Sequence, residues 1–296
     1  FHGYCGDTVL MNLTANAYLD CDTRVYRFRL VNGSNARIYR LAFMHAEQAL
    51  SFDVIGGDGG LLDKRMSAHE LFLSPGERAD VLVDLRTAAV GDRIVVASLP
   101  FDAMQMIGAA SRPTANAREA AVNGTPLELM LIRIIRQVRF ERVTPEVLSR
   151  SAVSTAEHAS TRLFKLDQVR GVWRINGGTY RMTETAFTVK RSTQEVWEFR
   201  NPAPGMPHPI HVHGFQYRVL ERRGSPEQIA RLAIDERGLA AHELNWKDTV
   251  LLWPGETLKI LIDFTHPFPG EQVYMLQCHN LEHEMHGMMQ NFKVTA

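Results

Sequence analysis

Residues 73–85, LSPGERADVLVDL, decide the fold because they recur near the end of the chain as residues 252–264, LWPGETLKILIDF. Each copy has a Pro-Gly turn followed by a segment in which apolar and polar residues alternate, as in a strand with one buried face. A second pair, VYRFR at residues 25–29 and VWEFR at residues 196–200, recurs at nearly the same spacing. Short alternating segments between Gly, Pro and Asn turns are typical of antiparallel sandwiches. The sequence therefore predicts an all-β chain that contains two copies of one Greek-key β-sandwich.

The length of 296 residues suits two domains of ordinary size. Residues 132–164 begin as an apolar strand and become polar and irregular, so we place the first domain at 1–140, a linker at 141–165 and the second domain at 166–296. A short helical insert is expected at residues 225–240, where Ser225 can cap, Pro226 fits the first turn and Ile229 begins an apolar face. The glycine-rich residues 55–60, IGGDGG, lack the context of a phosphate loop, which favours a turn.

The composition excludes several kinds of partner. Hydrophobic residues make up 45% and charged residues 22% of the chain, and 33 basic residues balance 33 acidic ones, so no overall field favours nucleic acid or anionic membranes. No apolar run is long enough to span a bilayer. Because the chain starts at Phe1, we expect that an upstream segment has been removed or left out. Cys5 and Cys21 can either form a disulfide or stay unpaired.

The histidines gather in two short segments, HPIHVHGF at residues 208–215 and LQCHNLEHEMHGMM at residues 276–289. On a strand, His211 and His213 point to one face, whereas Pro209 lets His208 face elsewhere. Cys278 and His279 likewise point to opposite faces, and the following loop can bring residues 283 and 288 back. A thiolate, two imidazoles and a distant methionine form the blue-copper ligand set, which we assign to the following residues: His208, Cys278, His283 and Met288.

Histidine and methionine residues also have simpler interpretations. A lone histidine or methionine is usually a packing or surface residue, and we interpret His286 in that way. Zinc also binds Cys and His, but it has no need of a methionine at the end of the loop, so copper is preferred. His279, with His211 and His213, is expected to lie toward a second metal site, joined to the first through one peptide unit.

At these residues the sequence resembles the multicopper oxidases, the laccase, bilirubin oxidase and cuprous oxidase family built from cupredoxin domains. The segments RVYRFRLVNGSN and LSPGERADVLVDL are similar to the middle domain of a three-domain member, and INGGTY, HPIHVHGF, WKDTVLLWPGE and CHNLEHEMHGMM are similar to the last domain. The resemblance covers essentially the whole chain. It implies two cupredoxin-like sandwiches, of which only the second carries copper ligands.

The resemblance also assigns roles to single residues. It implies that His208, Cys278 and His283 bind a type 1 copper with Met288 as the axial ligand. It further implies a type 2 copper ligand at His211 and type 3 copper ligands at His213 and His279. Glu284 matches an acidic residue implicated in proton delivery in some members; a solvated surface carboxylate is an equally good interpretation.

The chain departs from the family pattern in two ways. The opening domain of the family, which supplies half of a trinuclear copper cluster, has no counterpart here, and aligning Phe43 with Phe215 places Tyr39 and Leu41 opposite His211 and His213. In addition, Gln277 stands where the motif usually has a third type 3 histidine. Gln277 is expected to point toward the cluster, and an amide oxygen is a poor copper ligand, so one type 3 copper should be weakened or lost.

The resemblance implies a periplasmic or secreted enzyme that takes electrons from phenols, aromatic amines or metal ions at the type 1 copper. The electrons pass through Cys278 and His279 to the trinuclear cluster, which reduces O2 to water. Type 2 and type 3 coppers are expected only if an N-terminal cupredoxin domain is supplied by the same precursor or another chain. Trp246, Asp248 and the helical insert resemble the region that borders the type 1 site.

Two alternatives stay open at this point. The first is a blue-copper electron carrier or copper-binding protein that has lost oxygen reduction, for which Gln277 would be the signature. The second is a mononuclear site of His211, His213 and His279 at a subunit interface, as in copper nitrite reductases, which predicts a trimer.

Overall fold

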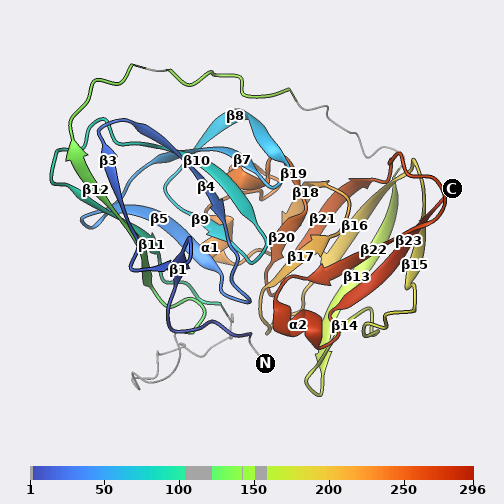
Figure 1. Ribbon diagram of the computed structural model, residues 1–296. Helices are drawn as coiled ribbons and strands as arrows, with labels where there is room; N and C mark the ends of the chain where they lie inside the picture. Colours follow the sequence, from blue (N-terminus) through green and yellow to red (C-terminus); the bar gives the residue numbers. More distant parts are fainter. Residues whose placement is uncertain (1–2, 104–121, 142, 151–158) are drawn as a thin grey trace.

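The computed structural model describes residues 3–103, 122–141, 143–150 and 159–296, and these form an almost entirely β structure. Figure 1 shows two sandwiches side by side: a first half with strands β1 to β12 and a second half with strands β13 to β23. The predicted all-β fold with two sandwiches is confirmed. The exact domain limits at residues 140 and 166 stay a prediction.

The first half contains three sheets within its described residues. They are a hairpin β1-β2, a four-stranded sheet in the order β4-β10-β7-β8, and a six-stranded sheet in which β3-β12-β11-β5-β6 are joined by β9 on β5. The strand bounds are β1 Leu10–Met11, β2 Thr14–Ala15, β3 Tyr18–Asp22, β4 Val25–Val31, β5 Tyr39–His45, β6 Gln48–Ala49, β7 Phe52–Gly57, β8 Gly60–Ala68, β9 Leu71–Leu73, β10 Arg78–Asp84, β11 Arg93–Ser98 and β12 Leu127–Arg136.

The second half contains two sheets, in the orders β14-β13-β16-β21-β18-β19 and β15-β23-β22-β17-β20. Their facing sides enclose a core of aromatic and aliphatic side chains that includes Trp197, Phe199 and Phe292. The strand bounds are β13 Ser160–Val169, β14 Val172–Ile175, β15 Phe187–Lys190, β16 Gln194–Arg200, β17 His208–Val212, β18 Tyr217–Arg223, β19 Trp246–Lys247, β20 Thr249–Leu252, β21 Thr257–Asp263, β22 Gln272–Cys278 and β23 Met289–Thr295.

The helices are few and short: α1 Glu227–Ala230, a 3-10 turn η1 Ala241–Glu243 and α2 Leu281–Met285. The predicted helix over residues 225–240 is therefore wrong in length. Ser225 does not cap it, because its hydroxyl donates to Glu256 Oε1 at 2.5 Å. Beyond Ala230 the backbone continues in turns, in which the N–H groups of Leu232 and Ala233 bond to carbonyls three residues earlier.

The repeated sequence segments form the same hydrogen-bonded turn in both halves. Glu77 accepts from the backbone N–H of Ser74 at 2.8 Å, and Glu256 accepts from that of Trp253 at 2.8 Å. Asn32 and Asn201 close the turns in the same way. The side-chain amide of Asn32 donates to the carbonyl of Leu73 at 2.9 Å, and that of Asn201 donates to Leu252 at 3.4 Å. We call this arrangement the asparagine latch.

The two halves meet through an apolar cluster and a group of buried charges. Phe72 of β9 packs edge-on against Trp253 with the ring centroids 5.2 Å apart, and Ile229 of α1 joins the same cluster. Lys247, whose side chain is fully buried, lies 2.9 Å from Glu77 and 3.1 Å from Asp58 across the junction. Removal of one partner from such a buried ion pair would leave an uncompensated buried charge and destabilise the protein.

Three further sequence expectations can be compared with the structure. Within the glycine-rich residues 55–60, Asp58 and Gly59 form the predicted turn, whereas residues 55–57 end β7 and Gly60 begins β8. Cys5 and Cys21 are both free. Within the described residues, no helix is sufficiently long and apolar to cross a membrane.

The asparagine latch predicts a stability effect. In Asn201→Ala the carbonyls of Met206 and Leu252 each lose a buried donor, so the free energy of unfolding should fall by about 1–3 kcal/mol. Urea unfolding followed by tryptophan fluorescence measures this change. Gln48→Ala, at an exposed position, is the matched control, and equal midpoints for both variants would contradict a stabilising role for the latch.

The junction predicts a pH dependence of stability. Burial, with the charge of Lys247, holds the pKa of His242 below its ordinary value of 6.5. Between the lowered pKa of folded His242 and the ordinary pKa of about 6.5, the unfolded chain binds more protons than the folded chain. The free energy of unfolding therefore falls as the pH drops below about 6.5. In His242→Gln the slope of unfolding free energy against pH between about pH 6.5 and 5 should fall by up to about 1.4 kcal/mol per unit. The exposed His69→Gln is the control; an unchanged slope in His242→Gln would refute this assignment.

Candidate metal centre

Strands β17 and β22 lie next to each other and carry most of the predicted site residues. They pair antiparallel, with Ile210 opposite Cys278 and His211 opposite Gln277. Because side chains alternate along a strand, Cys278 points into the sandwich, whereas His211 and Gln277 share the other face. The two candidate sites are thus separated by one sheet, and Cys278 and His279 stand on either side of a single peptide bond.

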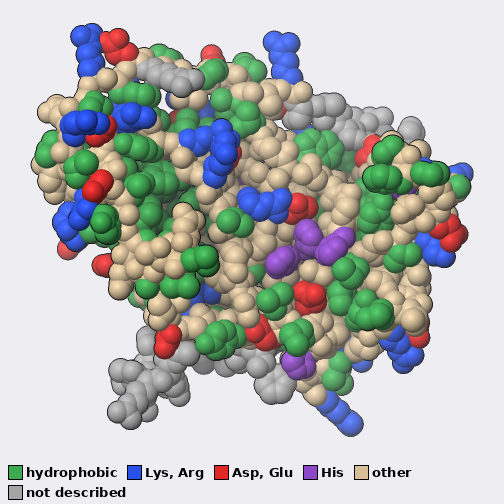
Figure 2. Space-filling view, viewed as in Figure 1, with side chains coloured by type: hydrophobic (Ala, Val, Ile, Leu, Met, Phe, Trp, Pro, Cys, Tyr) green, Lys and Arg blue, Asp and Glu red, His purple; other side chains and the backbone are tan. Residues whose placement is uncertain are grey.

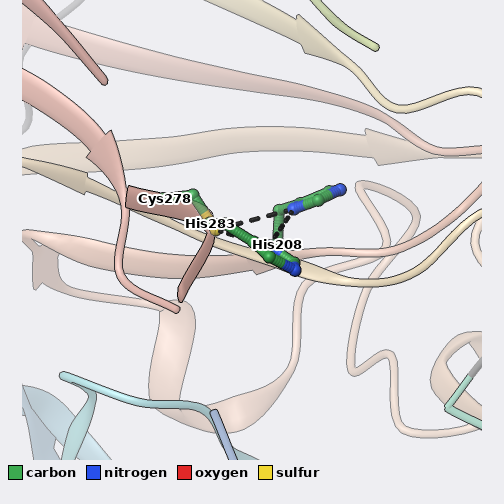
Figure 3. Close-up of side chains that lie close together, drawn as sticks. All are labelled: His208, Cys278 and His283. Carbon is green, nitrogen blue, oxygen red and sulfur yellow. Dashed lines mark hydrogen bonds between the residues drawn. The ribbon is translucent and has the colours of Figure 1, made fainter. Parts of the chain in front are cut away.

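Three of the predicted ligands meet inside the second sandwich (Figure 3). Cys278 Sγ lies 3.5 Å from Nδ1 of His208 and 3.5 Å from Nδ1 of His283, and the two Nδ1 atoms lie 3.1 Å apart. All three side chains are buried, and we call His208, Cys278 and His283 the triad. They form the one group of metal-ligating side chains of this kind found among the described residues.

A short loop returns His283 to Cys278. Asn280 caps α2, because its side-chain oxygen accepts from the backbone N–H groups of Glu282 at 3.2 Å and His283 at 3.4 Å. Met288 closes the loop: its N–H donates to the carbonyl of His283 at 2.9 Å, and its carbonyl accepts from the N–H of Cys278 at 3.0 Å. The Met288 side chain is fully buried. The predicted axial methionine is therefore anchored to both neighbouring ligands through its backbone.

Burial sets the protonation of this group. It holds the pKa of His208 well below the ordinary 6.5, with a further contribution from His283, so this imidazole is neutral. Burial also raises the pKa of the Cys278 thiol far above 9.0, so without a cation the thiol keeps its proton. A metal ion that binds here must release that proton, which couples metal affinity to pH.

The donor set fits copper. Two imidazoles and one thiol converge on one point, and a buried methionine lies on the same loop. A soft sulfur donor with two imidazoles and a weak methionine suits both oxidation states of copper, whereas zinc prefers four strong ligands. The residues that would hold the ion are the predicted His208, Cys278, His283 and Met288.

Trp173 of β14 is a site residue that the sequence did not reveal. Its ring packs against His283 with a centroid distance of 4.3 Å and edge-on against His208 at 4.9 Å. It also lines a cavity of about 330 Å³ that reaches His208 and is bordered by Pro202, Pro204 and Met206. A lone tryptophan on a short strand gives no sequence signal of such a position, because its contacts depend on how β14 folds over the sheet.

The second set of histidines is more exposed. Figure 2 shows histidine side chains grouped at the surface between the two halves. The ring of His211 lies 4.8 Å from that of His213 and 5.5 Å from that of His279, centroid to centroid. Burial lowers the pKa of His213 and of His279, which favours the neutral, metal-binding form. The structure thus places the three predicted ligands together on one face.

The remaining predicted residues differ in their exposure to solvent. Gln277 is buried beside His211, and within the described residues its Oε1 has no hydrogen-bond partner. Glu284 is half-buried on α2. His286 is exposed, and its Nδ1 lies 2.6 Å from the carbonyl of Glu282, in keeping with a surface role.

The expectation that Trp246 and Asp248 border the type 1 site is wrong. Asp248 lies beside His211, with its backbone oxygen 2.9 Å from Nδ1 of that imidazole, and Trp246 contacts the first half at Gly59. The insert residue Ile229 packs at the junction of the halves. Sequence proximity to the ligand strands misled this expectation, because the segment leads across the junction instead of over His208.

The expected alignment of Tyr39 and Leu41 with His211 and His213 is also wrong. Tyr39 pairs with Leu73 in the first half as His208 pairs with Leu252 in the second, and the asparagine latch makes these leucines equivalent. Tyr39 therefore corresponds to His208.

By the same register, Ala42 and Met44 of the first half are equivalent to His211 and His213 of the second half. Ser98, which pairs with Leu41, takes the place of Cys278, which pairs with Ile210. Hydrogen-bond register, and not the shared phenylalanine, decides which residues of the two halves are equivalent. The first half still presents none of these ligands.

Comparison with known proteins gives one family. Residues 152–296 match the family model described as multicopper oxidase. The chain is 32% identical over 310 residues to a laccase of Bacillus subtilis, covering 99% of this chain and 55% of that protein. It is 31% identical to the multicopper oxidase mco of Staphylococcus epidermidis, covering 99% of this chain and 53% of that protein. The chain thus spans about half the length of the curated relatives it matches.

A solved structure agrees. The McoA multicopper oxidase of Aquifex aeolicus superposes with a TM-score of 0.86 at 36% identity, covering 100% of this chain and 60% of that one. The likeness extends over both sandwiches, including the half that lacks copper ligands.

Removal of one buried ligand should abolish tight copper binding at the first site. His208→Ala takes away one of three convergent donors, so copper affinity should fall by more than the roughly 10- to 100-fold that loss of an outer partner costs. Competition against a copper chelator measures the affinity. His286→Ala keeps the triad and should bind as the unaltered chain does; equal affinities in both variants would show that the triad is not the binding site.

Proposed function

Because the chain belongs to the multicopper oxidase family, we propose that it is the electron-accepting part of a laccase-like copper oxidase. The complete enzyme would oxidise phenols, aromatic amines or metal ions and reduce O2 to water. One observation carries the proposal: a buried His-Cys-His group touches a cavity on one side and, through the next residue in the chain, a second group of histidines on the other.

The cavity beside His208 is the proposed binding place of the reducing substrate. Trp173, two prolines and Met206 give it apolar walls, and Asp167, Gln168 and Asn201 provide polar groups. Such a lining suits a small aromatic molecule with one or two polar substituents. Because His208 forms part of the wall, a bound donor would approach the triad through an imidazole and not through solvent.

The peptide bond between Cys278 and His279 gives a short covalent path from the triad to the second group of histidines. When bound, copper would supply one-electron redox chemistry at the triad and O2 reduction at the second group. Cys278 belongs to the triad, and His279 points to the other face toward His211. We propose Glu284 on α2 as the carboxylate that delivers protons to the second group.

The second group needs further ligands. We propose that His211 serves a type 2 copper and that His213 and His279 serve type 3 coppers, with the remaining histidines supplied by another cupredoxin domain of the same precursor or another chain. Gln277 would weaken copper at this place, because its amide oxygen stands beside His211. The relatives are laccases and multicopper oxidases by name, which favours an oxidase over an electron carrier. A periplasmic or secreted location stays a prediction.

The cavity can be tested with the chain as it stands. The copper-loaded protein should show strong visible absorption, and anaerobic addition of a phenolic reductant should bleach it at a rate that saturates with concentration. Gln168→Trp narrows the cavity and should raise the half-saturating concentration about tenfold, equivalent to about 1.4 kcal/mol.

Gln48→Trp, in the first half and away from the cavity, is the matched control. Absence of the visible band would refute the copper assignment. Identical bleaching in the two tryptophan variants would refute the cavity as the substrate site.

A further inference from the structure

The first half grips one short segment of the second half, residues 247–249. Lys247 is held by Asp58 and Glu77 at 3.1 and 2.9 Å, with all three side chains buried. Asp248 accepts two hydrogen bonds from the guanidinium of Arg78, at 2.7 and 2.6 Å. The first half thus contributes three charged side chains to a segment that carries no copper ligand itself. We call these contacts the clamp.

The glycine-rich turn brings Asp58 into the clamp. A Cβ on Gly59 would lie 2.3 Å from Cβ of Trp246, and one on Gly57 would lie 3.0 Å from the carbonyl oxygen of His242. The N–H of Gly59 donates to the carbonyl of Trp246 at 2.8 Å. The glycines therefore allow close approach of two backbones, and the carboxylate of Asp58 then accepts from the N–H groups of residues 248 and 249 at 3.3 and 3.2 Å.

The clamped segment touches His211. Nδ1 of His211 lies 2.9 Å from the backbone oxygen of Asp248 and 3.0 Å from Oγ1 of Thr249. A carbonyl oxygen only accepts, and the Thr249 hydroxyl already donates to Asp248 Oδ1 at 2.9 Å. His211 must therefore carry its proton on Nδ1 when neutral, which leaves the lone pair on Nε2 free to bind a metal.

A second contact from the same half reaches another histidine of the group. Gly76 lies in the turn that precedes Arg78, and a Cβ added to it would lie 2.8 Å from Cδ2 of His279. The turn therefore packs directly on this ring. Two separate turns of the half without copper ligands thus border the metal-binding face of the other half.

We propose that Asp58, Glu77 and Arg78 are positioning residues, which fix the segment 247–249 and through it the Nδ1–H tautomer of His211. The first half would then prepare a metal ligand without supplying one. The proposal rests on the proposed function only for the identity of the metal, because the tautomer is a property of the metal-free chain. A clamp that merely joined the halves would leave the tautomer unchanged.

The test is nitrogen NMR of the metal-free, ¹⁵N-histidine-labelled chain at about pH 8, well above the ordinary imidazole pKa near 6.5. The His211 signals are identified by their loss in His211→Asn. The unaltered chain should show a protonated Nδ1 and an unprotonated Nε2 at His211. In Arg78→Gln and in Asp248→Ala these two resonances should shift toward each other as the second tautomer appears, and the double variant should shift no further than the singles.

Arg133→Gln is the matched control, because Arg133 makes an equally bidentate pair with Asp20 inside the first half, at 2.6 and 2.8 Å. It should leave the His211 resonances in place. Unshifted His211 resonances in both Arg78→Gln and Asp248→Ala, or an equal shift in Arg133→Gln, would overturn the clamp. Absence of the visible copper band in the copper-loaded, unaltered chain would count against the proposed function. It would not affect the tautomer result, which is measured on the metal-free chain.

Discussion

The alternation of side chains along β22 is the constraint on which the rest of the site depends. Cys278 and its neighbour His279 are forced to opposite sides of one sheet, so the chain has a dry triad on the inside and a wetter histidine group on the outside. The pairing with β17 imposes the same division on His208 and His211. A shift of one residue in the register of either strand would exchange the two environments and disperse both groups.

The ligands could be predicted from sequence because their spacing follows strand periodicity and one short loop. The duplicated turn could be predicted for a similar reason, since Glu77 and Glu256 accept hydrogen bonds from residues three positions earlier in the chain. Trp173, Asp58 and Arg78 could not be found in this way. Their roles arise from packing between elements far apart in sequence, for which a single chain gives no periodic signal. The helical insert was overestimated because its apolar residues serve the junction and not the face of a continuous helix.

The electrostatics divide in the same manner as the geometry. Burial keeps the His208 imidazole and the Cys278 thiol uncharged, which suits ligands that bind a cation. At the junction, by contrast, Arg78 and other hydrogen-bond donors outweigh burial and hold the pKa of Asp248 well below its usual range. The uncharged His208 and Cys278 and the ionised Asp248 therefore lie on opposite sides of one sheet. On the outer side, His211 contacts the backbone of Asp248.

The asparagine latch also bears on how such a protein can change over generations. Both halves keep the same hydrogen-bonded frame, yet one presents Tyr39 and Ser98 where the other presents His208 and Cys278. The same hydrogen-bonded frame can therefore carry copper ligands or other side chains, and its turns do not depend on those ligands. The half without copper ligands can then serve another role, that of a scaffold for the half that has them.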